Sequence, residues 1–245
     1  RAKERELAKV ISKDPKILSD CELIIIALPI DKLIIPSKAL IQSLPSKAVV
    51  TDVASVKEPV LKVWQEIHQY FVASHPMAGN ASSGVEAGCL GLFKNRPWVC
   101  TPNERTDLKS LDRVMQLAKD LEAQFIKTEP GQHDKAVALI SHLPVLISAA
   151  LLQTVGHEKN SEVLHLAKLL ASSGFEDTSR VGGGNPELGK AMAANNVEAL
   201  KKCLRDYILN IKNIESQIES KDWEMLKEDL IFCKDIRPSF IKKIL

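Results

Sequence analysis

The sequence predicts an α/β domain with an open parallel sheet followed by an all-helical domain, and three observations predict this fold class. Strand-like and helix-like segments alternate up to Glu129. After that residue the strand-like segments end and helical periodicity takes over. The 245 residues are enough for two modest domains, each with its own core. We therefore expect domains over residues 1–129 and 130–245.

The strand candidates are short apolar runs rich in β-branched residues. Glu22–Leu28 (ELIIIAL) is an uninterrupted run, typical of a strand buried on both faces of a parallel sheet. The other candidates are Ala48–Val53, Tyr70–Ser74, Trp98–Thr101 and the weaker Gln124–Lys127. Open parallel sheets bind ligands beyond the carboxyl ends of their strands. A ligand is therefore expected near the loops that begin at Pro29, Ala54 and His75.

Amphipathic helices connect these strands. Each of two segments places its apolar residues on one helical face, which predicts packing against the sheet. The two faces are Val60, Val63, Trp64 and Ile67 in the first segment and Leu108, Leu111, Met115 and Ala118 in the second. The opening residues, Arg1–Glu6, resemble the middle of an exposed helix.

The second half is predicted to be helical throughout. Gly131–Thr154 reads as one long helix that is kinked near Pro144, because proline removes a backbone donor. Asn185 and Pro186 form a helix start, with the asparagine as the cap. From Val197 an apolar stripe continues for about six turns. The stripe can be buried against neighbouring helices or against a second subunit, and both remain open.

Composition excludes several classes of protein. A formal net charge of +2 and an ordinary charged fraction of 26% argue against a nucleic-acid or acidic-membrane partner. The longest uninterrupted apolar run, Leu23–Leu28, is too short to span a bilayer, and no signal peptide is visible. The five cysteines are scattered, without a C-x-x-C pair, which predicts no disulfide framework and no metal site. We expect a cytoplasmic protein.

His75 is the clearest candidate for chemistry. It follows a predicted buried strand and precedes Pro-Met-Ala-Gly, so it is expected at the carboxyl end of the sheet with a rigid turn behind it. A histidine held there can accept a proton near neutral pH. The alternative is a loop histidine with no role beyond ending the strand. His68, His157 and His165 are predicted to be structural or exposed.

Three further residues have both a structural and a functional interpretation. Ser55 and Glu58 match a capping box, which would explain the serine as a helix cap at the ligand end of a strand. Arg180 is the one cation in a stretch of small and polar residues, and a guanidinium binds carboxylates bidentately. The nearby Gly182–Gly184 is interpreted as a tight backbone turn rather than a phosphate cradle. His142 lies beside the predicted kink and on its own is more typical of a packed histidine.

Four motifs taken together resemble the prephenate/arogenate dehydrogenase family, and in detail its cyanobacterial arogenate dehydrogenases. They are TDVASVK (Thr51–Lys57), SHPMAG (Ser74–Gly79), ISHLP (Ile140–Pro144) and DTSRVGGGNPE (Asp177–Glu187). The resemblance implies a Rossmann-type domain followed by an all-α dimerisation domain, and therefore a cytoplasmic homodimer. It also implies oxidative decarboxylation of arogenate or prephenate with NADP or NAD, a step of tyrosine biosynthesis.

The resemblance also assigns roles to residues. His75 corresponds to the catalytic base, and Ser55 to a serine that hydrogen-bonds near both the substrate hydroxyl and the nicotinamide. Arg180 corresponds to the arginine that binds the substrate, and His142 to a histidine that lines the substrate pocket. Pro29 and Ile30 correspond to a loop along the cofactor. No metal is implied, nor any nucleic-acid or membrane partner.

One departure from the family is large. The family begins with a strand, a G-x-G-x-x-G turn that cradles the cofactor pyrophosphate, a helix and a second strand. None of these is present, so we expect a chain that lacks its first strand–helix–strand unit and binds NAD(P) poorly by itself. The alternative is a non-catalytic dimeric binding protein, or a decayed enzyme, that retains the substrate pocket. A hydroxy-acid dehydrogenase is disfavoured, because those enzymes usually place a lysine base on the helical domain.

Overall fold

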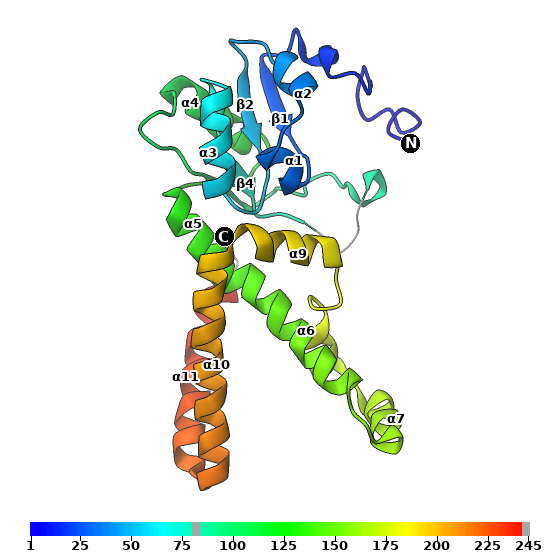
Figure 1. Ribbon diagram of the computed structural model, residues 1–245, viewed down its shortest axis with the longest axis vertical. Coiled ribbons are helices and arrows are strands. Elements are labelled where there is room, and N and C mark those ends of the chain that lie inside the picture. The colour runs from blue at the N-terminus through cyan, green and yellow to red at the C-terminus, as the bar shows by residue number, and fades with distance from the viewer. Residues whose placement is uncertain (80–83, 242–245) are drawn as a thin grey trace.

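The computed structural model describes residues 1–79 and 84–241 of the chain. An α/β part lies at one end, and a helical part extends away from it (Figure 1). In chain order the α/β part comprises η1 (Pro15–Leu18), β1 (Leu23–Ile26), α1 (Ile30–Ile34), α2 (Lys38–Gln42), β2 (Val49–Asp52), α3 (Glu58–Ile67), β3 (Phe71–Val72), β4 (Ser74–Pro76), η2 (Val85–Ala87), β5 (Pro97–Cys100), α4 (Leu108–Asp120) and β6 (Gln124–Lys127). The helical part comprises α5 (Pro130–Val137), η3 (Ala138–His142), α6 (Leu143–Gly156), α7 (Ser161–Leu170), α8 (Ser173–Ser179), α9 (Pro186–Asn195), α10 (Val197–Ser220) and α11 (Trp223–Ile241).

The first sheet is parallel, with the strand order β1-β2-β3. This confirms the predicted β-α-β arrangement. Ile24 and Ile26 of β1 are buried in the core, but Ile25 on the other face is 44% exposed. The prediction that β1 is buried on both faces is therefore wrong for this chain. The helix on that side, α4, packs over β2, β3 and β6, and β1 at the edge of the sheet is left largely uncovered.

The second sheet contains β4, β5 and β6, and it departs from the predicted all-parallel arrangement. β5 and β6 are parallel, but β4 runs antiparallel to β5 and places His75 opposite Val99. The predicted run Tyr70–Ser74 is divided, because β3 ends at Val72 and β4 begins at Ser74. His75 thus lies within a strand, not in a loop after one. An apolar run predicts burial but carries no information on strand direction.

The connecting helices bury most of the predicted faces. In α3, Val60 and Trp64 are fully buried, and the Trp64 indole donates to the carbonyl of Leu33 at 2.8 Å. In α4, Leu111 and Ala118 are buried as predicted, together with Val114. Leu108 is the exception: it is the first residue of α4 and is 71% exposed.

The opening residues do not form the predicted helix. Residues 2–6 form turns, and this segment is largely exposed. A helix of so few residues, with little of its surface packed against the rest of the chain, does not offset the cost of its first turn.

The long predicted helix is present, and its irregularity lies where Pro144 predicts it. The helix is continuous over residues 130–156, with a π-helical turn at Ala138–His142 immediately before the proline. Pro144 has no N–H to give to the carbonyl one turn earlier, so the regular hydrogen-bond ladder is interrupted there. By length and composition this helix could cross a bilayer, although polar residues such as Ser141 and Ser148 interrupt its apolar runs. Only 22% of its most apolar window is buried.

The predicted stripe on α10 is buried only in its first turns. Leu200 and Cys203 are buried, whereas Ile211 and Ile218 are 45% and 51% exposed. α11 runs alongside α10 (Figure 1), but it also leaves large apolar side chains in contact with solvent. The single chain therefore does not bury its own apolar helical surface.

Gly182 brings the loop after α8 against α6. Its N–H donates to the hydroxyl of the buried Ser148 at 2.8 Å. A Cβ at Gly182 would lie 2.3 Å from the backbone nitrogen of Ala149, a distance that sterics forbid. The glycine is therefore required by close approach between backbones.

Candidate functional site

His75 contacts the helical part directly. Its Nδ1 lies 2.9 Å from Nε2 of His133, the fourth residue of α5, and the two rings are nearly perpendicular. His133 is buried, whereas His75 is half-buried. The position of β4 on one side and of α5 on the other therefore fixes one edge of the His75 ring.

Asp134 continues this chain of hydrogen bonds. Its Oδ1 lies 2.7 Å from Nδ1 of His133, and both residues are at least 96% buried. The same carboxylate accepts the backbone N–H of Lys57 at 2.7 Å and that of Glu58 at 2.9 Å. Three donors thus converge on one buried carboxylate at the junction of the two parts.

This arrangement corrects the predicted capping box. α3 begins at Glu58, and no side chain of its own segment caps it. Ser55 is half-buried and makes no hydrogen bond within the part of the chain that the structure describes. The free N–H groups of the first turn are instead satisfied by Asp134, a residue 76 positions away. Because Ser55 is not the cap, its hydroxyl is free for a ligand at the end of β2.

A buried ion pair contacts the backbone of Ser74, the residue before His75. Lys57 and Asp52 are both fully buried and form an ion pair. The Lys57 ammonium also donates to the carbonyl of Ser74, at 2.6 Å, while the Asp52 carboxylate accepts the backbone N–H groups of Ala54 and Ser74. The pair thus connects the ends of β2 and β4 and fixes the strand that carries His75.

The surroundings of His75 favour its neutral form. Burial lowers its pKa well below 6.5, and the positive charge of the neighbouring Lys57 lowers it further. A neutral imidazole has one bare nitrogen that can accept a proton. Since Nδ1 faces His133, the nitrogen left for a substrate is Nε2.

His142 is a second buried histidine at the junction. It ends the π-helical turn, is 1% exposed, and its Nδ1 lies 3.3 Å from the Asn196 side-chain nitrogen. Since that amide nitrogen can only donate, Nδ1 accepts and Nε2 carries the proton. Nε2 has no hydrogen-bond partner among the described residues. Burial lowers the pKa of His142. A buried donor without a partner is suited to an acceptor atom of a ligand.

The remaining predicted residues form no hydrogen bond or ion pair with His75 in the part of the chain that the structure describes. Arg180 directly follows α8 as its C-cap, is exposed, and forms no hydrogen bond or ion pair through its side chain with the described residues. Pro29 is exposed where α1 begins, after the carboxyl end of β1. The side chain of Ile30 is buried in the core, so only its backbone can face a cofactor.

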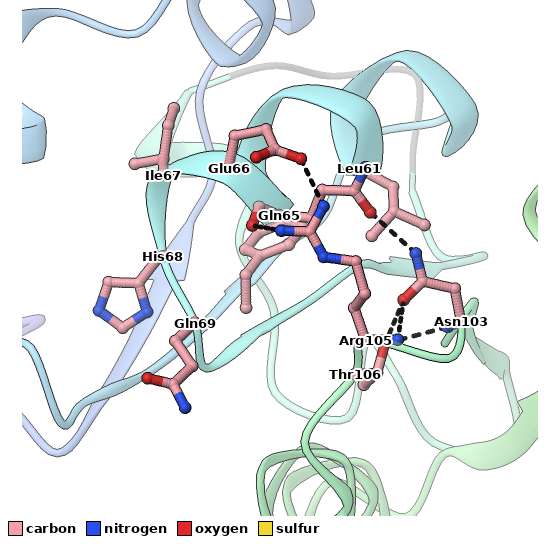
Figure 2. A pocket seen from close by; sticks show the side chains of 10 residues that line it. Leu61, Gln65, Glu66, Ile67, His68, Gln69, Asn103, Arg105 and Thr106 are labelled. Carbon is pink, nitrogen blue, oxygen red and sulfur yellow. Dashed lines mark hydrogen bonds and ion pairs between the residues drawn. The ribbon is translucent and has the colours of Figure 1, made fainter.

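The pocket shown in Figure 2 does not belong to this site. It lies at the carboxyl end of α3 and is lined by Gln65, Asn103 and Arg105, among others. Several of its polar groups pair with one another: Arg105 pairs with Glu66, and Asn103 donates to Gln65 at 2.8 Å. None of the three site histidines lines it.

Sequence reasoning identified His75 and His142 but missed most of what surrounds them. Lys57 lies within the TDVASVK motif, but nothing in the neighbouring sequence indicates that its side chain is buried against the strand that carries His75. His133 and Asp134 are adjacent in Gln-His-Asp-Lys, which reads as an ordinary polar first turn. Their proximity to His75 is visible only in the three-dimensional structure, because they lie at least 58 residues away in the sequence.

Two family models match the chain. One, described as the nucleotide-binding domain of prephenate dehydrogenase, matches residues 1–127, and the other, its dimerization domain, matches residues 129–232. A prephenate dehydrogenase from Bacillus subtilis is 29% identical over 224 residues, which are 90% of this chain. The chain spans only 60% of the length of that relative.

Solved structures of arogenate and prephenate dehydrogenases are similar to this chain over almost its whole length. Arogenate dehydrogenase from Synechocystis is 40% identical, with a TM-score of 0.83, covering 98% of this chain and 86% of that one. Prephenate dehydrogenase from Aquifex aeolicus, in complex with hydroxyphenyl propionate and NAD+, is 25% identical with a TM-score of 0.90. Its alignment covers 98% of this chain and 84% of that chain.

Proposed function

The chain belongs to the prephenate dehydrogenase family, and on that premise we propose that it oxidatively decarboxylates arogenate, or prephenate, with a nicotinamide cofactor in tyrosine biosynthesis. The observation that carries the proposal is His75, a neutral imidazole whose Nδ1 contacts His133 and whose Nε2 has no partner among the described residues. The 40% identity to an arogenate dehydrogenase supports arogenate as the first substrate to test.

In this proposal His75 acts as the general base. Its Nε2 takes the proton of the ring hydroxyl as the carbon that bears this hydroxyl loses hydride. The bound nicotinamide supplies the hydride acceptor. The bond to the ring carboxylate then breaks, carbon dioxide leaves, and the electron pair of that bond completes the aromatic ring. Formation of the aromatic ring makes the reaction effectively irreversible.

Other residues hold the substrate. Arg180 is an exposed cation with no intrachain partner among the described residues, and a guanidinium matches a carboxylate in bidentate geometry. His142 offers a buried Nε2–H to a substrate oxygen. The free hydroxyl of Ser55 supports a hydrogen bond near the reacting hydroxyl and the nicotinamide. Positioning by these groups lowers the entropic part of the barrier.

The residues present fit one end of the cofactor. Pro29 and Ser55 follow β1 and β2, at the sheet edge where such folds bind nicotinamide, and both have exposed surface. The pyrophosphate end is not matched within residues 1–245, because their first glycine is Gly79 and residues 1–22 contain no glycine-rich turn. We propose NADP, with NAD as the alternative, and residues 1–245 supply only part of the cofactor site.

We also propose a cytoplasmic homodimer formed by the helical part, with the domain division at residues 129/130. Support comes from the matched dimerization domain and from the apolar side chains that α10 and α11 leave exposed. The apolar helix over residues 130–156 is mostly uncovered in the single chain, as expected if a second copy covers it.

The test is a side-by-side assay of the protein as its gene encodes it, with arogenate and prephenate and with NADP and NAD. We expect reduced nicotinamide to form with arogenate, together with release of carbon dioxide in equal amount. The competing function, a dimeric binding protein, predicts the opposite pattern: equilibrium binding of arogenate or tyrosine, but no nicotinamide binding and no carbon dioxide.

A further inference from the structure

The hydrogen bonds between Asp134, His133 and His75 determine which ring nitrogen of each histidine carries the proton. The Asp134 carboxylate accepts hydrogen bonds only, so the ring nitrogen of His133 that faces it must carry the proton. In the neutral ring the opposite nitrogen, Nε2, is then an acceptor. That nitrogen lies 2.9 Å from Nδ1 of His75. Nδ1 of His75 must therefore be the donor, which leaves its Nε2 bare.

From this geometry we propose that His133 and Asp134 are positioning residues that set the tautomer of His75. The proposal rests on the general-base function proposed above. An isolated histidine favours the opposite tautomer, with the proton on Nε2, and in that form His75 would present a donor to a substrate hydroxyl. The chain from Asp134 through His133 to His75 excludes this form. It also stabilises the imidazolium that forms when Nε2 takes a proton, as the third group of a catalytic triad does.

Burial and anchoring make the arrangement rigid. His133 and Asp134 are 4% and 3% exposed, so water does not compete for their hydrogen bonds. The Asp134 carboxylate is also held by the N–H groups of Lys57 and Glu58, and its backbone carbonyl accepts from Asn196 at 2.7 Å. Asp134 therefore joins the start of α3, α5 and the start of α10. If the α/β part and the helical part lost contact, His75 would no longer be held with its proton on Nδ1.

The first test replaces His133. In His133→Phe the acceptor for Nδ1 is lost, and we expect kcat to fall by about 100-fold or more while KM changes little. In His133→Gln an amide oxygen takes the place of Nε2, and we expect most of the activity to return. A kcat for His133→Phe within threefold of the wild type would overturn the proposal, and so would equal kcat values for the two variants.

The second test separates catalysis from helix capping. Asp134→Ala removes a carboxylate cap from α3. As a matched control, Asp107→Ala removes the carboxylate cap of α4, where Oδ2 of Asp107 accepts the backbone N–H of Ser110 at 2.8 Å. We expect both variants to be less stable in urea unfolding, but only Asp134→Ala to lose kcat by 10-fold or more. Equal kcat values in the two variants would contradict a positioning role for Asp134.

The third test is independent of turnover. The ¹⁵N chemical shifts of the His75 ring, measured at neutral pH, should show a protonated Nδ1 and a bare Nε2 in the wild type. In folded His133→Phe they should move toward the form protonated on Nε2. A wild-type His75 protonated on Nε2 would overturn the inference even if the enzyme is active. If the shifts are as expected but the protein shows no turnover, the inference about the His75 tautomer is supported and the proposed function is contradicted.

Discussion

At the scale of single residues, the environment of His75 determines when it can act as a base. Its pKa is lowered first by burial and then by the charge of Lys57. We therefore expect kcat/KM to be independent of pH around neutrality and to fall only below about pH 6.5, the ordinary value for histidine. A pH profile of kcat/KM checks this, and an acidic limb centred above pH 6.5 would contradict it.

The same shift affects stability. Because the folded-state pKa lies below the unfolded one, the unfolded chain takes up the proton first as the pH falls. The free energy of unfolding should therefore decrease below about pH 6.5 more steeply in the wild type than in His75→Asn, which has no group to titrate there. Urea unfolding of both proteins across this range measures the difference, and parallel curves would contradict the shift.

The buried pair of Lys57 and Asp52 gives a second prediction at this scale. In Asp52→Asn the ammonium remains buried without its counter-charge, and we expect a loss of about 3–5 kcal/mol in the free energy of unfolding. The double variant Asp52→Leu, Lys57→Met removes both charges and should recover most of that loss. If the double variant is no more stable than the single one, the charges are not coupled as described.

The limits of sequence reasoning are clearest for these residues. The position of His75 before a Pro-Met-Ala-Gly turn was enough to select it. The predicted role of Ser55 as a cap failed because the competing acceptor, Asp134, comes from a distant helix. Local patterns cannot rank an acceptor 76 positions away above one in the same turn.

At the scale of elements, Gly182 controls how the loop that follows Arg180 meets α6. A methyl group there would clash with the backbone at Ser148 and Ala149, whereas at Gly183 its nearest atoms lie at 3.9 Å. We expect Gly182→Ala to lower the free energy of unfolding by about 1–3 kcal/mol, and the matched Gly183→Ala to change it much less. Thermal unfolding of the two variants checks this. Equal effects would mean that close approach is not what requires the first glycine.

Several elements were predictable because their signals are local. The faces of α3 and α4, the Asn185 cap and the irregularity before Pro144 all follow from residues within one or two turns. The direction of β4 was not predictable, since its pairing with β5 depends on how the intervening chain returns. Arg1–Glu6 has helix-forming composition but little surface to pack against, and it forms turns.

At the scale of the whole molecule, exposed apolar side chains on the helical part predict assembly. Ile211 of α10 is 45% exposed, and we expect Ile211→Lys to raise the dissociation constant of the dimer by about 30-fold or more. Asn213→Lys places the same charge two residues further along the same helix and serves as the control. Sedimentation velocity over a range of concentrations measures both. A monomeric wild type, or a variant that dimerises like the wild type, would contradict the predicted interface.

The orientation of His75 depends on the contact between the two parts of the molecule, whereas that of His142 is set within the helical part. His75 comes from a strand and His142 from a helix, and the residues that orient them, His133 and Asn196, belong to the helical part. The sequence motifs supplied the list of reacting groups, while the junction of the α/β and helical parts determines which nitrogen of the His75 ring is available.

The central claim is that His75 is the base of an oxidative decarboxylation. Its most direct test is the rate of nicotinamide reduction with arogenate by the wild type and by His75→Asn, with unfolding curves recorded for both. We predict that His75→Asn folds with near wild-type stability and binds substrate, but turns over at least about 10²-fold more slowly. A folded His75→Asn with full activity would contradict the account.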